Sequence, residues 1–376
     1  MLIKNAKIIF LESIQEGSVR VEEGKITAIN PESAQDEHVI DAKGAYLAPG
    51  FIDVHIHGAG GRDTMEGSFD ALNTIAKAIA NHGTTSFTPT TMTVDKDEVK
   101  KAVKAIAEAK ISGTEGANVL GVHMEGPFIN SAMIGAQNPK YVASPSVEAF
   151  KYMAGEYEDA VVSVTLAPEV DGAKELISYL KDKGIRASMG HTKATYSEAM
   201  EGISCGVCHA THLYNAMTPL HHRDPGVVGA IFDSEITTET ISDGIHIAYP
   251  SLRVAYKQKG TDKMLLVSDA MMACSMPDGD YSLGGQKVIV SNGAARLENG
   301  ALAGSVLTLD KAVKNVKNNT NYPLNEIVRM ATYNAAIHCN VEDRKGLIKE
   351  GYDADLILFD EDINIQKVIV NGKIVK

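Results

Sequence analysis

Apolar and polar positions alternate in two different ways along this chain. In its middle part, short apolar runs of strand type alternate with longer stretches whose apolar residues recur at helical spacing. The apolar runs of strand length lie at residues 51–57, 84–91, 119–125, 161–167, 185–191, 207–213, 238–242 and 263–269. Amphipathic helical patterns separate most of them, at residues 69–82, 95–110, 171–183 and 197–206. Eight strands with crossover helices predict an α/β fold, a (β/α)8 TIM-type barrel.

The two ends of the chain carry a different pattern. Short β-type runs broken by turn signals fill residues 1–50, and residues 346–376 resume the same style around the Asn371-Gly372 turn signal. Neither end has enough strands for a stable sheet of its own. We therefore predict a small β-sandwich domain built from residues 1–50 and 341–376, and a barrel domain over residues 51–340.

Two parts of the barrel region depart from the regular alternation. The link between the sixth and seventh strands is mostly loop. After the eighth strand, the pattern predicts a hairpin-rich insert at residues 281–303, followed by helices at residues 305–318 and 324–339.

Composition and charge exclude several classes of protein. The 376 residues carry a formal net charge of −12, which offers no positive field to nucleic-acid phosphates. No apolar run approaches the roughly 18 residues needed to cross a bilayer, and no signal-peptide pattern opens the chain. We expect a cytoplasmic protein with neither nucleic acid nor membrane as a partner.

The cysteines give one motif that we set aside. Four scattered cysteines make no disulfide framework, but Cys205, Cys208 and His209 match the C-x-x-C-H pattern of haem attachment. That pattern needs an exported protein, and its second half falls inside the apolar run of the sixth strand. No second cysteine pair completes a structural zinc site. We expect buried, inert thiols.

Titratable side chains gather where the predicted barrel strands end. They are His55, His57, Glu125, His191, His212, His246 and Asp269. Because the C-terminal ends of barrel strands meet at one mouth, where active sites of this fold lie, we expect all of them in one pocket. Random scatter of 12 histidines would not place five of them there.

Residue types and spacing at these positions point to a metal. His55 and His57 are two apart, so both rings can face the barrel interior. The alternative for them is a polar pair hydrogen-bonded to loops. Glu125 ends an apolar strand, where a carboxylate is costly without a cation, although a lysine or arginine could also pair with it. For His123 we favour a structural role.

The donor set limits the metal and suggests a base. Imidazole and carboxylate ligands accept zinc or ferrous iron, with cobalt and manganese as further options. Asp269 is the natural general base for metal-activated water, or else a further metal ligand.

Over essentially its whole length, the chain closely resembles the N-acetylglucosamine-6-phosphate deacetylases, a family within the amidohydrolase superfamily. Segments beginning at Pro49, His123, Gly190, Thr211, Asp243, Ser268 and Leu302 carry the resemblance. The most specific are the glutamate at position 125 and the segments Leu-Tyr-Asn-Ala-Met and Asp-Gly-Ile-His.

The resemblance implies roles for the gathered residues. Glu125, His191 and His212 would hold the principal metal, and His55 and His57 a second, so that one or two divalent ions bind. Asp269 would be the catalytic acid and base. His246 would contact the substrate near its acetyl carbonyl.

The resemblance also implies a sugar-phosphate site and a homodimer. Its residues would be Ala136, Gln137, Asn215, Ala216, Arg223, His246, Leu302, Ala303 and Gly304. Arg223 would reach into the partner subunit's site, although an ordinary solvated loop is the alternative for residues 221–223. Gln137 stands where other branches of the family place a histidine, which leaves the tolerance for other amino sugars open.

The implied reaction is hydrolysis of the acetamide of N-acetyl-D-glucosamine 6-phosphate to D-glucosamine 6-phosphate and acetate, in amino-sugar catabolism or cell-wall recycling. The nearest alternative is a deacetylase for another N-acetyl-hexosamine phosphate, such as N-acetylgalactosamine 6-phosphate. A deaminase or cyclic-amide hydrolase, a silent scaffold, and a sugar-binding protein without turnover are further alternatives.

Overall fold

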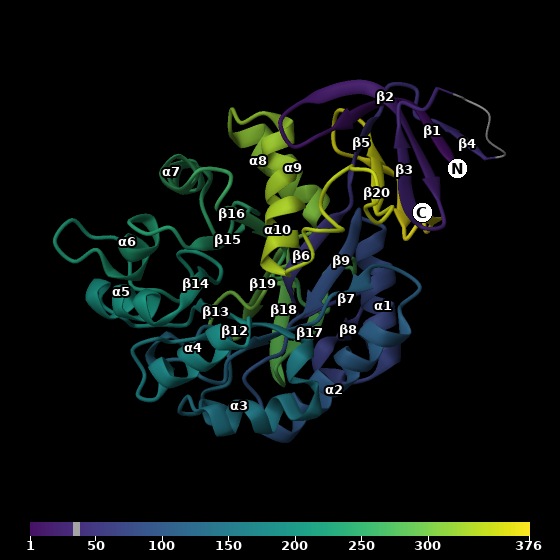
Figure 1. Ribbon diagram of the computed structural model, residues 1–376. Coiled ribbons are helices and arrows are strands. Elements are labelled where there is room, and N and C mark those ends of the chain that lie inside the picture. The colour runs from purple at the N-terminus through teal and green to yellow at the C-terminus, as the bar shows by residue number, and fades with distance from the viewer. Residues whose placement is uncertain (33–37) are drawn as a thin grey trace.

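The computed structural model describes residues 1–32 and 38–376, and a closed barrel of parallel strands lies at its centre (Figure 1). Its strands are β6 (Phe51–Ile56), β9 (Thr84–Pro89), β10 (Asn118–Val119) with β11 (Val122–Glu125), β12 (Val161–Leu166), β13 (Arg186–Met189), β14 (Val207–Ala210), β15 (Thr237–Ile241) and β16 (Met264–Val267). Bridges between Thr90 and His123 and between Ile56 and Ala270 join the two sheets into a barrel. The predicted fold class is confirmed.

The barrel strands are buried on both faces, which explains their composition. All residues of β6, β9 and β12 are buried, and β-branched side chains dominate the last two. Such near-continuous apolar or β-branched runs are typical of parallel strands covered by helices. The hydroxyls buried with them bond to neighbouring backbone, as Thr88 does to the Val54 carbonyl at 2.7 Å.

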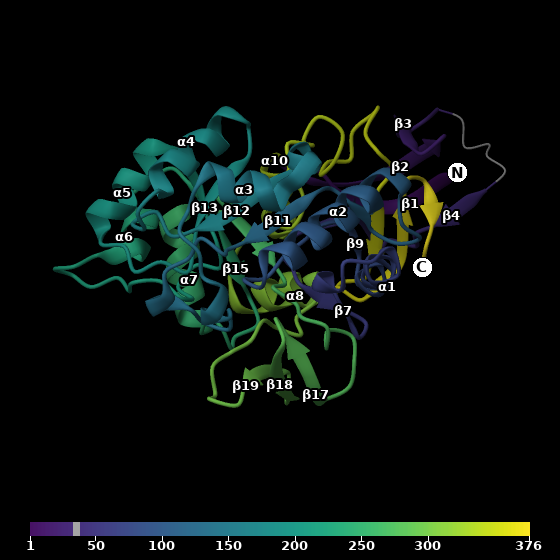
Figure 2. The same cartoon turned by 90° about the horizontal axis from the view of Figure 1, so that it is seen from below.

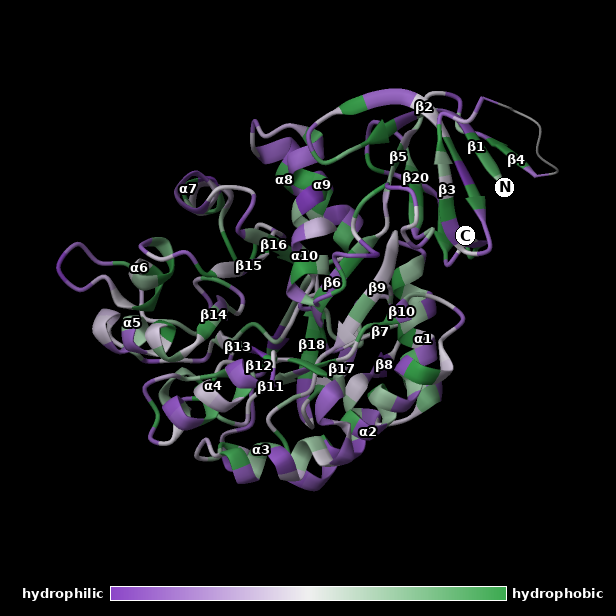
Figure 3. Cartoon of the chain, viewed as in Figure 1, coloured by the Kyte–Doolittle hydropathy of each residue, from purple (hydrophilic) through white to green (hydrophobic). Residues whose placement is uncertain are grey.

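Helices surround the barrel, and most have one hydrophobic face and one hydrophilic face. They are α1 (Phe69–Ala80), α2 (Lys96–Ser112), α3 (Val147–Ala154), α4 (Ala173–Asp182), α5 (Tyr196–Cys205), α6 (Gly226–Phe232), α7 (Tyr249–Lys259), α8 (Leu309–Asn319), α9 (Leu324–Met330) and α10 (Tyr333–His338). Hydrophobic and hydrophilic stretches alternate along α1, α2 and α3 (Figure 3). Among the described residues, no helix is both long and apolar enough to span a membrane.

Several strands are shorter than predicted, and the difference lies where the chemistry is. β13, β14 and β16 each stop two residues before His191, His212 and Asp269. These three residues have φ values of 47°, 31° and 47°, in the left-handed region that residues with a Cβ rarely adopt. The chain therefore turns sharply out of each strand at a predicted site residue.

Two other elements are interrupted. The third barrel strand breaks between β10 and β11 at Gly121, whose φ of +153° goes with a Cβ position only 2.4 Å from the Ala160 carbonyl oxygen. The single helix predicted at residues 324–339 is two helices, α9 and α10, because Thr332 between them has φ −133° and ψ −84°.

The chain ends form one hydrogen-bonded sheet. Its strands are β1 (Leu2–Ile9), β2 (Ile14–Glu22), β3 (Lys25–Ile29), β4 (Val39–Asp41), β5 (Tyr46–Pro49), β20 (Leu356–Phe359), β21 (Ile365–Val370) and β22 (Lys373–Ile374). β20 runs antiparallel to β5, so the C-terminal strands continue the N-terminal sheet, and both termini lie on it (Figure 1). The two predicted domain boundaries stay predictions.

An antiparallel sheet projects from one side of the barrel (Figure 2). Its strands are β17 (Gly279–Leu283), β18 (Gln286–Ser291) and β19 (Ala294–Leu297), so the sheet begins two residues before the insert predicted at residues 281–303. The four cysteines are free; Cys274 and Cys339 are buried, whereas Cys205 and Cys208 are half-buried, contrary to our expectation for that pair. Cys205 is the last residue of α5, two residues before β14 begins.

A buried cluster of charges joins the terminal sheet to the barrel. The Lys345 side chain, 3% exposed, contacts Asp355 and lies 3.1 Å from Asp353. Asp355 also accepts hydrogen bonds from the Asn371 backbone at 2.7 Å and from the Asn118 side chain of β10 at 3.3 Å. The lysine therefore compensates the buried charge of Asp355, whereas Asp353 also pairs with Lys25 and Arg344.

We predict that Lys345→Met lowers the free energy of unfolding by about 3–5 kcal/mol, because it leaves the buried carboxylate of Asp355 without a cation. Urea unfolding followed by circular dichroism measures the change. Lys373→Met, at an exposed position of β22, is the control and should stay within about 0.5 kcal/mol of wild type. A loss equal to the control's would show that Lys345 does not hold the junction.

Candidate metal centre and active site

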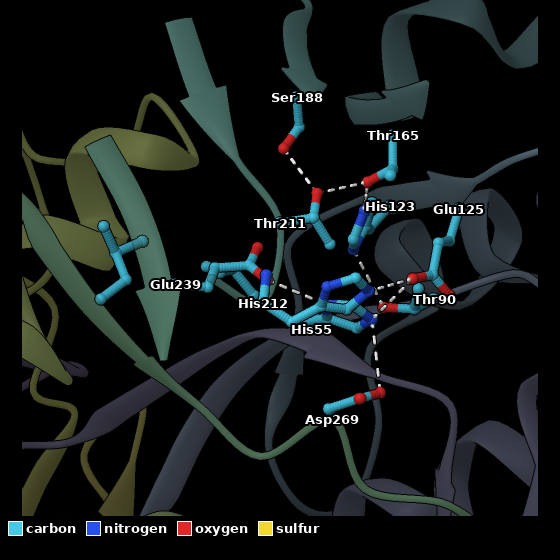
Figure 4. A network of polar contacts seen from close by, with 12 residues as sticks. His55, Thr90, His123, Glu125, Thr165, Ser188, Thr211, His212, Glu239 and Asp269 are labelled. Atoms are coloured by element: carbon cyan, nitrogen blue, oxygen red, sulfur yellow. Dashed lines mark hydrogen bonds and ion pairs between the residues drawn. The ribbon is translucent and has the colours of Figure 1, made fainter. Parts of the chain in front are cut away.

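The carboxylate of Glu125 points toward the ring of His55 (Figure 4), and four imidazoles lie close to its two oxygens. Its Oε1 is 3.1 Å from Nε2 of His212, 3.2 Å from Nε2 of His191 and 3.6 Å from Nε2 of His55. Its Oε2 is 3.2 Å from Nε2 of His57. Two groups could therefore hold an ion, one of His55, His57 and Glu125 and one of Glu125, His191 and His212.

The hydrogen bonds of two rings show which of their nitrogens is available to a cation. Nδ1 of His191 is 2.9 Å from the Met133 carbonyl, and Nδ1 of His57 is 3.2 Å from the Thr90 carbonyl. A carbonyl only accepts, so each Nδ1 carries a proton, and Nε2 is the nitrogen of each ring that is left to bind an ion beside Glu125.

In neutral rings, nitrogen lone pairs that face one another repel unless a cation lies between them. The Nε2 atoms of His191 and His212 are 3.2 Å apart, and Nε2 of His55 is buried without any hydrogen bond. Imidazole and carboxylate donors at such spacing fit a divalent ion of the zinc or ferrous type. The residues present thus fit the metal that the sequence implies.

Without a metal, protons on the rings supply the positive charge that Glu125 requires. Burial would raise the pKa of Glu125, but the charge of His55 and the hydrogen bonds of His191 and His212 hold that pKa well below its usual value. Burial alone would lower the pKa of His57, but Asp269 and Glu125 raise it to about 9. In the described part of the chain, the ion pairs of Glu125 come from histidines alone, not from the lysine or arginine of the alternative interpretation.

Asp269 contacts two of the rings that Glu125 contacts, those of His55 and His57. Its Oδ1 is 3.3 Å from Nε2 of His57 and 3.4 Å from Nε2 of His55. Its burial would raise its pKa, but the charge of His55 and the hydrogen bond of His57 lower it, so the carboxyl group is ionised. An ionised carboxylate at this place can accept a proton from water.

His246 is held by a neighbouring carboxylate. Oδ2 of Asp243 lies 2.7 Å from Nδ1 of His246, and Oδ1 accepts the backbone N–H groups of Ile245 and His246, both at 2.8 Å. His246 lines the cavity, so Asp243 fixes how its ring is presented there.

A cavity of about 280 Å³ opens beside the cluster and collects most of the predicted site residues. The predicted residues that line it are His57, Glu125, Ala136, Gln137, His191, His212, Asn215, Ala216, His246, Asp269, Leu302 and Gly304. His55 and Ala303 are fully buried. Arg223 lies apart, in an exposed loop where its side chain contacts His222 at 2.7 Å.

Gln137 makes two hydrogen bonds that the sequence does not predict. Its Nε2 donates to Oε2 of Glu125 at 2.6 Å, and its Oε1 accepts the Thr93 backbone N–H at 2.7 Å. Both ends of the amide are therefore engaged in orienting Glu125. Gln137 also lines the cavity, and its predicted contact with a sugar stays a prediction.

His123 lies below the cluster. Nε2 of His123 is 2.7 Å from the Thr165 hydroxyl, and Nδ1 is 3.3 Å from the Thr90 hydroxyl. Burial lowers the pKa of His123 to about 3, so the ring is neutral. Its hydrogen-bond partners in the described part of the chain are hydroxyls, which suits a structural residue.

Glu239 was missed in the sequence. It lies within β15, is 1% exposed, and its Oε2 is 2.9 Å from Nδ1 of His55. The available signal was an acidic residue inside a run of threonines and isoleucine, where a buried charge needs a reason.

Comparisons with known proteins agree with this geometry. A model of the amidohydrolase family matches residues 46–375. A curated N-acetylglucosamine-6-phosphate deacetylase of Lysinibacillus sphaericus is 39% identical over 377 residues, covering 100% of this chain and 97% of that protein.

Solved structures agree as well. The N-acetylglucosamine-6-phosphate deacetylase of Pasteurella multocida has 34% identity and a TM-score of 0.94, with 99% of this chain and 98% of that one covered. An aspartate-to-alanine variant of the Mycobacterium smegmatis enzyme, in complex with N-acetyl-D-glucosamine-6-phosphate, has 29% identity and a TM-score of 0.94, covering 100% and 99%.

We predict that Glu125→Gln reduces bound metal at both groups, because each group includes this carboxylate. Dialysis against limiting free Zn²⁺, followed by elemental analysis, should show affinity lower by about 10–100-fold or more, the loss expected when even a supporting residue is removed. Glu175→Gln, at an exposed position of α4, should bind as wild type does. Unchanged metal content in Glu125→Gln would exclude Glu125 as a ligand.

Proposed function

Because the chain belongs to the amidohydrolase family, we propose that it hydrolyses the acetamide of N-acetylglucosamine 6-phosphate to glucosamine 6-phosphate and acetate. The observation that carries the proposal is the meeting of Glu125, the histidines and Asp269 beside one cavity. Similarity of 39% over the full chain to a deacetylase of that name supports the choice of substrate. The complex of a related enzyme with N-acetyl-D-glucosamine-6-phosphate supports it further.

We assign the principal metal to Glu125, His191 and His212, and a second to His55 and His57 with the same glutamate. A divalent cation there supplies Lewis acidity, since it lowers the pKa of water and polarises the acetyl carbonyl. Zinc and ferrous iron suit these donors best, and cobalt and manganese are compatible with them.

Asp269 moves the proton in the proposed reaction. As a buried carboxylate it accepts a proton from the attacking water, whose oxygen bonds to the acetyl carbon. It then returns the proton to the amide nitrogen while the carbon–nitrogen bond breaks. The products are acetate and a free amine.

His246 acts on the carbonyl in this account. Asp243, 2.7 Å from Nδ1, stabilises the ring when both nitrogens carry protons. Nε2 then donates to the carbonyl oxygen as negative charge builds on it, which lowers the barrier.

The phosphate needs a cation, because the protein as a whole is acidic, with a net charge of −12. We assign the sugar phosphate to the cavity wall at Asn215 and Ala216, and its phosphate to Arg223 of a second subunit. The exposed loop that carries Arg223 suits such a reach, and the enzyme is then a homodimer. A phosphorylated substrate and four free cysteines fit a cytoplasmic enzyme.

The proposal is tested by acetate release from N-acetylglucosamine 6-phosphate, with purified protein before and after chelation and after metal restoration. Turnover should vanish with the metal and return with it. Absence of turnover by the metal-replete protein would refute the assigned substrate. Faster turnover of N-acetylgalactosamine 6-phosphate in a parallel assay would favour that sugar instead.

We predict that Asp269→Asn lowers kcat by about 10²–10⁴-fold, because the amide can no longer carry the proton. Metal content and substrate affinity should persist, as measured by elemental analysis and calorimetry. Asp262→Asn, at an exposed position before β16, should keep wild-type kcat. Near-wild-type kcat in Asp269→Asn would remove the residue from the proton transfer.

We predict that Arg223→Ala raises KM for the phosphorylated sugar about 10–100-fold, the loss of about 1.5–3 kcal/mol expected for a charged hydrogen bond. KM for the unphosphorylated sugar should hardly change, and Arg253→Ala on α7 should behave as wild type. Mixed dimers of Arg223→Ala and Asp269→Asn subunits should regain activity, since one site then has both residues. Failure to regain it would place Arg223 in its own subunit's site.

A further inference from the structure

Glu239 is the one carboxylate of the described residues that contacts both candidate metal groups without belonging to either. It lies within β15 and is 1% exposed. Figure 4 shows it on the far side of His55 from Asp269. A buried charge so placed needs partners, and those of Glu239 among the described residues are His55, His209 and the backbone of His212.

Its first contact is with a metal-binding ring. Oε2 of Glu239 is 2.9 Å from Nδ1 of His55. A carboxylate only accepts, so Nδ1 carries a proton, and Nε2 is the nitrogen left to bind an ion. That Nε2 is buried without a hydrogen bond, 3.4 Å from Asp269 and 3.6 Å from Glu125. Glu239 therefore decides which nitrogen of His55 faces the ion.

Its second contact is with the backbone of the other group. The same Oε2 accepts the N–H of His212 at 3.1 Å. His212 has a φ of 31°, a conformation that needs support from its surroundings. One oxygen thus holds a ring of the His55 group and the main chain of the His191 group.

Its other oxygen is fixed as well. Oε1 lies 3.2 Å from Nε2 of His209, whose Nδ1 is 2.6 Å from the Thr237 hydroxyl. The His209 ring packs against His338 with centroids 4.3 Å apart. Both oxygens of Glu239 are therefore held in place, and the carboxylate cannot turn away from His55 without breaking these contacts.

We propose that Glu239 is a positioning residue that gives this centre its capacity for a second ion, by holding His55 as an Nε2 ligand and tying it to the backbone of His212. The proposal rests on the proposed metal centre, not on the identity of the sugar substrate. Partners of metal-bound histidines commonly contribute about 10–100-fold to metal affinity.

The test is calorimetric titration of metal-stripped protein with Zn²⁺. Wild type should bind two ions. Glu239→Gln keeps an acceptor for His55 but loses the charge, and it should retain the first ion while weakening the second about 10–100-fold. Glu239→Ala removes both contacts and should lose the second ion and weaken the first. Thr240→Val, a buried change on the same strand, is the matched control and should bind as wild type does.

A spectroscopic readout separates positioning from general stability. Visible absorption during Co²⁺ titration should show the second ion's contribution in wild type and lose it in Glu239→Gln, while the melting temperatures of the two metal-stripped proteins agree. Binding of two ions by Glu239→Gln at wild-type affinity would overturn the proposal. Binding of one ion or none by wild type, or equal loss of both ions with a lowered melting temperature, would overturn it too. An inactive wild type that binds two ions would contradict only the assigned substrate.

Discussion

The structure is built around one buried carboxylate. Glu125 is 2% exposed, and its ion-pair contacts in the described chain are with histidines. A buried charge of this kind is costly unless a cation compensates it. Four imidazole nitrogens within 3.1–3.6 Å of its two oxygens provide the neutral donors that a divalent ion requires. The remaining features of the site serve to keep these donors pointing inward.

The barrel brings the ends of its strands together, and the backbone after each strand sets the direction of the site side chains. Three site residues, His191, His212 and Asp269, lie just beyond their strands with left-handed φ values. Such conformations persist only where the surrounding structure determines them. Here that support comes from short backbone bonds, including one from the Asp269 N–H to the His55 carbonyl at 2.9 Å. The first and eighth strands are thereby joined at the same place where their side chains meet.

Much of this arrangement could be predicted from the sequence. The apolar runs and their spacing indicate the barrel, and polar residues at the ends of those runs indicate the mouth, because both signals are local. The shortened strands could not be predicted in this way, since the left-handed turns at His191, His212 and Asp269 depend on bonds to distant backbone. The break at Gly121 depends likewise on a close approach to Ala160.

The side chains that support the metal ligands could not be predicted either, because their contacts are with residues far away in the sequence. The amide of Gln137 joins Glu125 to the Thr93 backbone, a contact that the sequence does not indicate. Glu239 lies in a strand that reads as ordinary buried β-structure, and its role depends on the neighbouring position of His55. Such pairs are set by the register between strands far apart in sequence. Only the ligands themselves carry a recognisable pattern.

The central claim is that Glu125 is the ligand shared by both metal groups. Crystals of the Zn²⁺-loaded protein, with anomalous diffraction collected on either side of the zinc edge, test this most directly. We expect one anomalous peak about 2.0–2.2 Å from Nε2 of His191, Nε2 of His212 and a Glu125 oxygen. A second peak should lie beside His55 and His57. Zinc bound elsewhere, or bound to the histidines with Glu125 turned away, would contradict it.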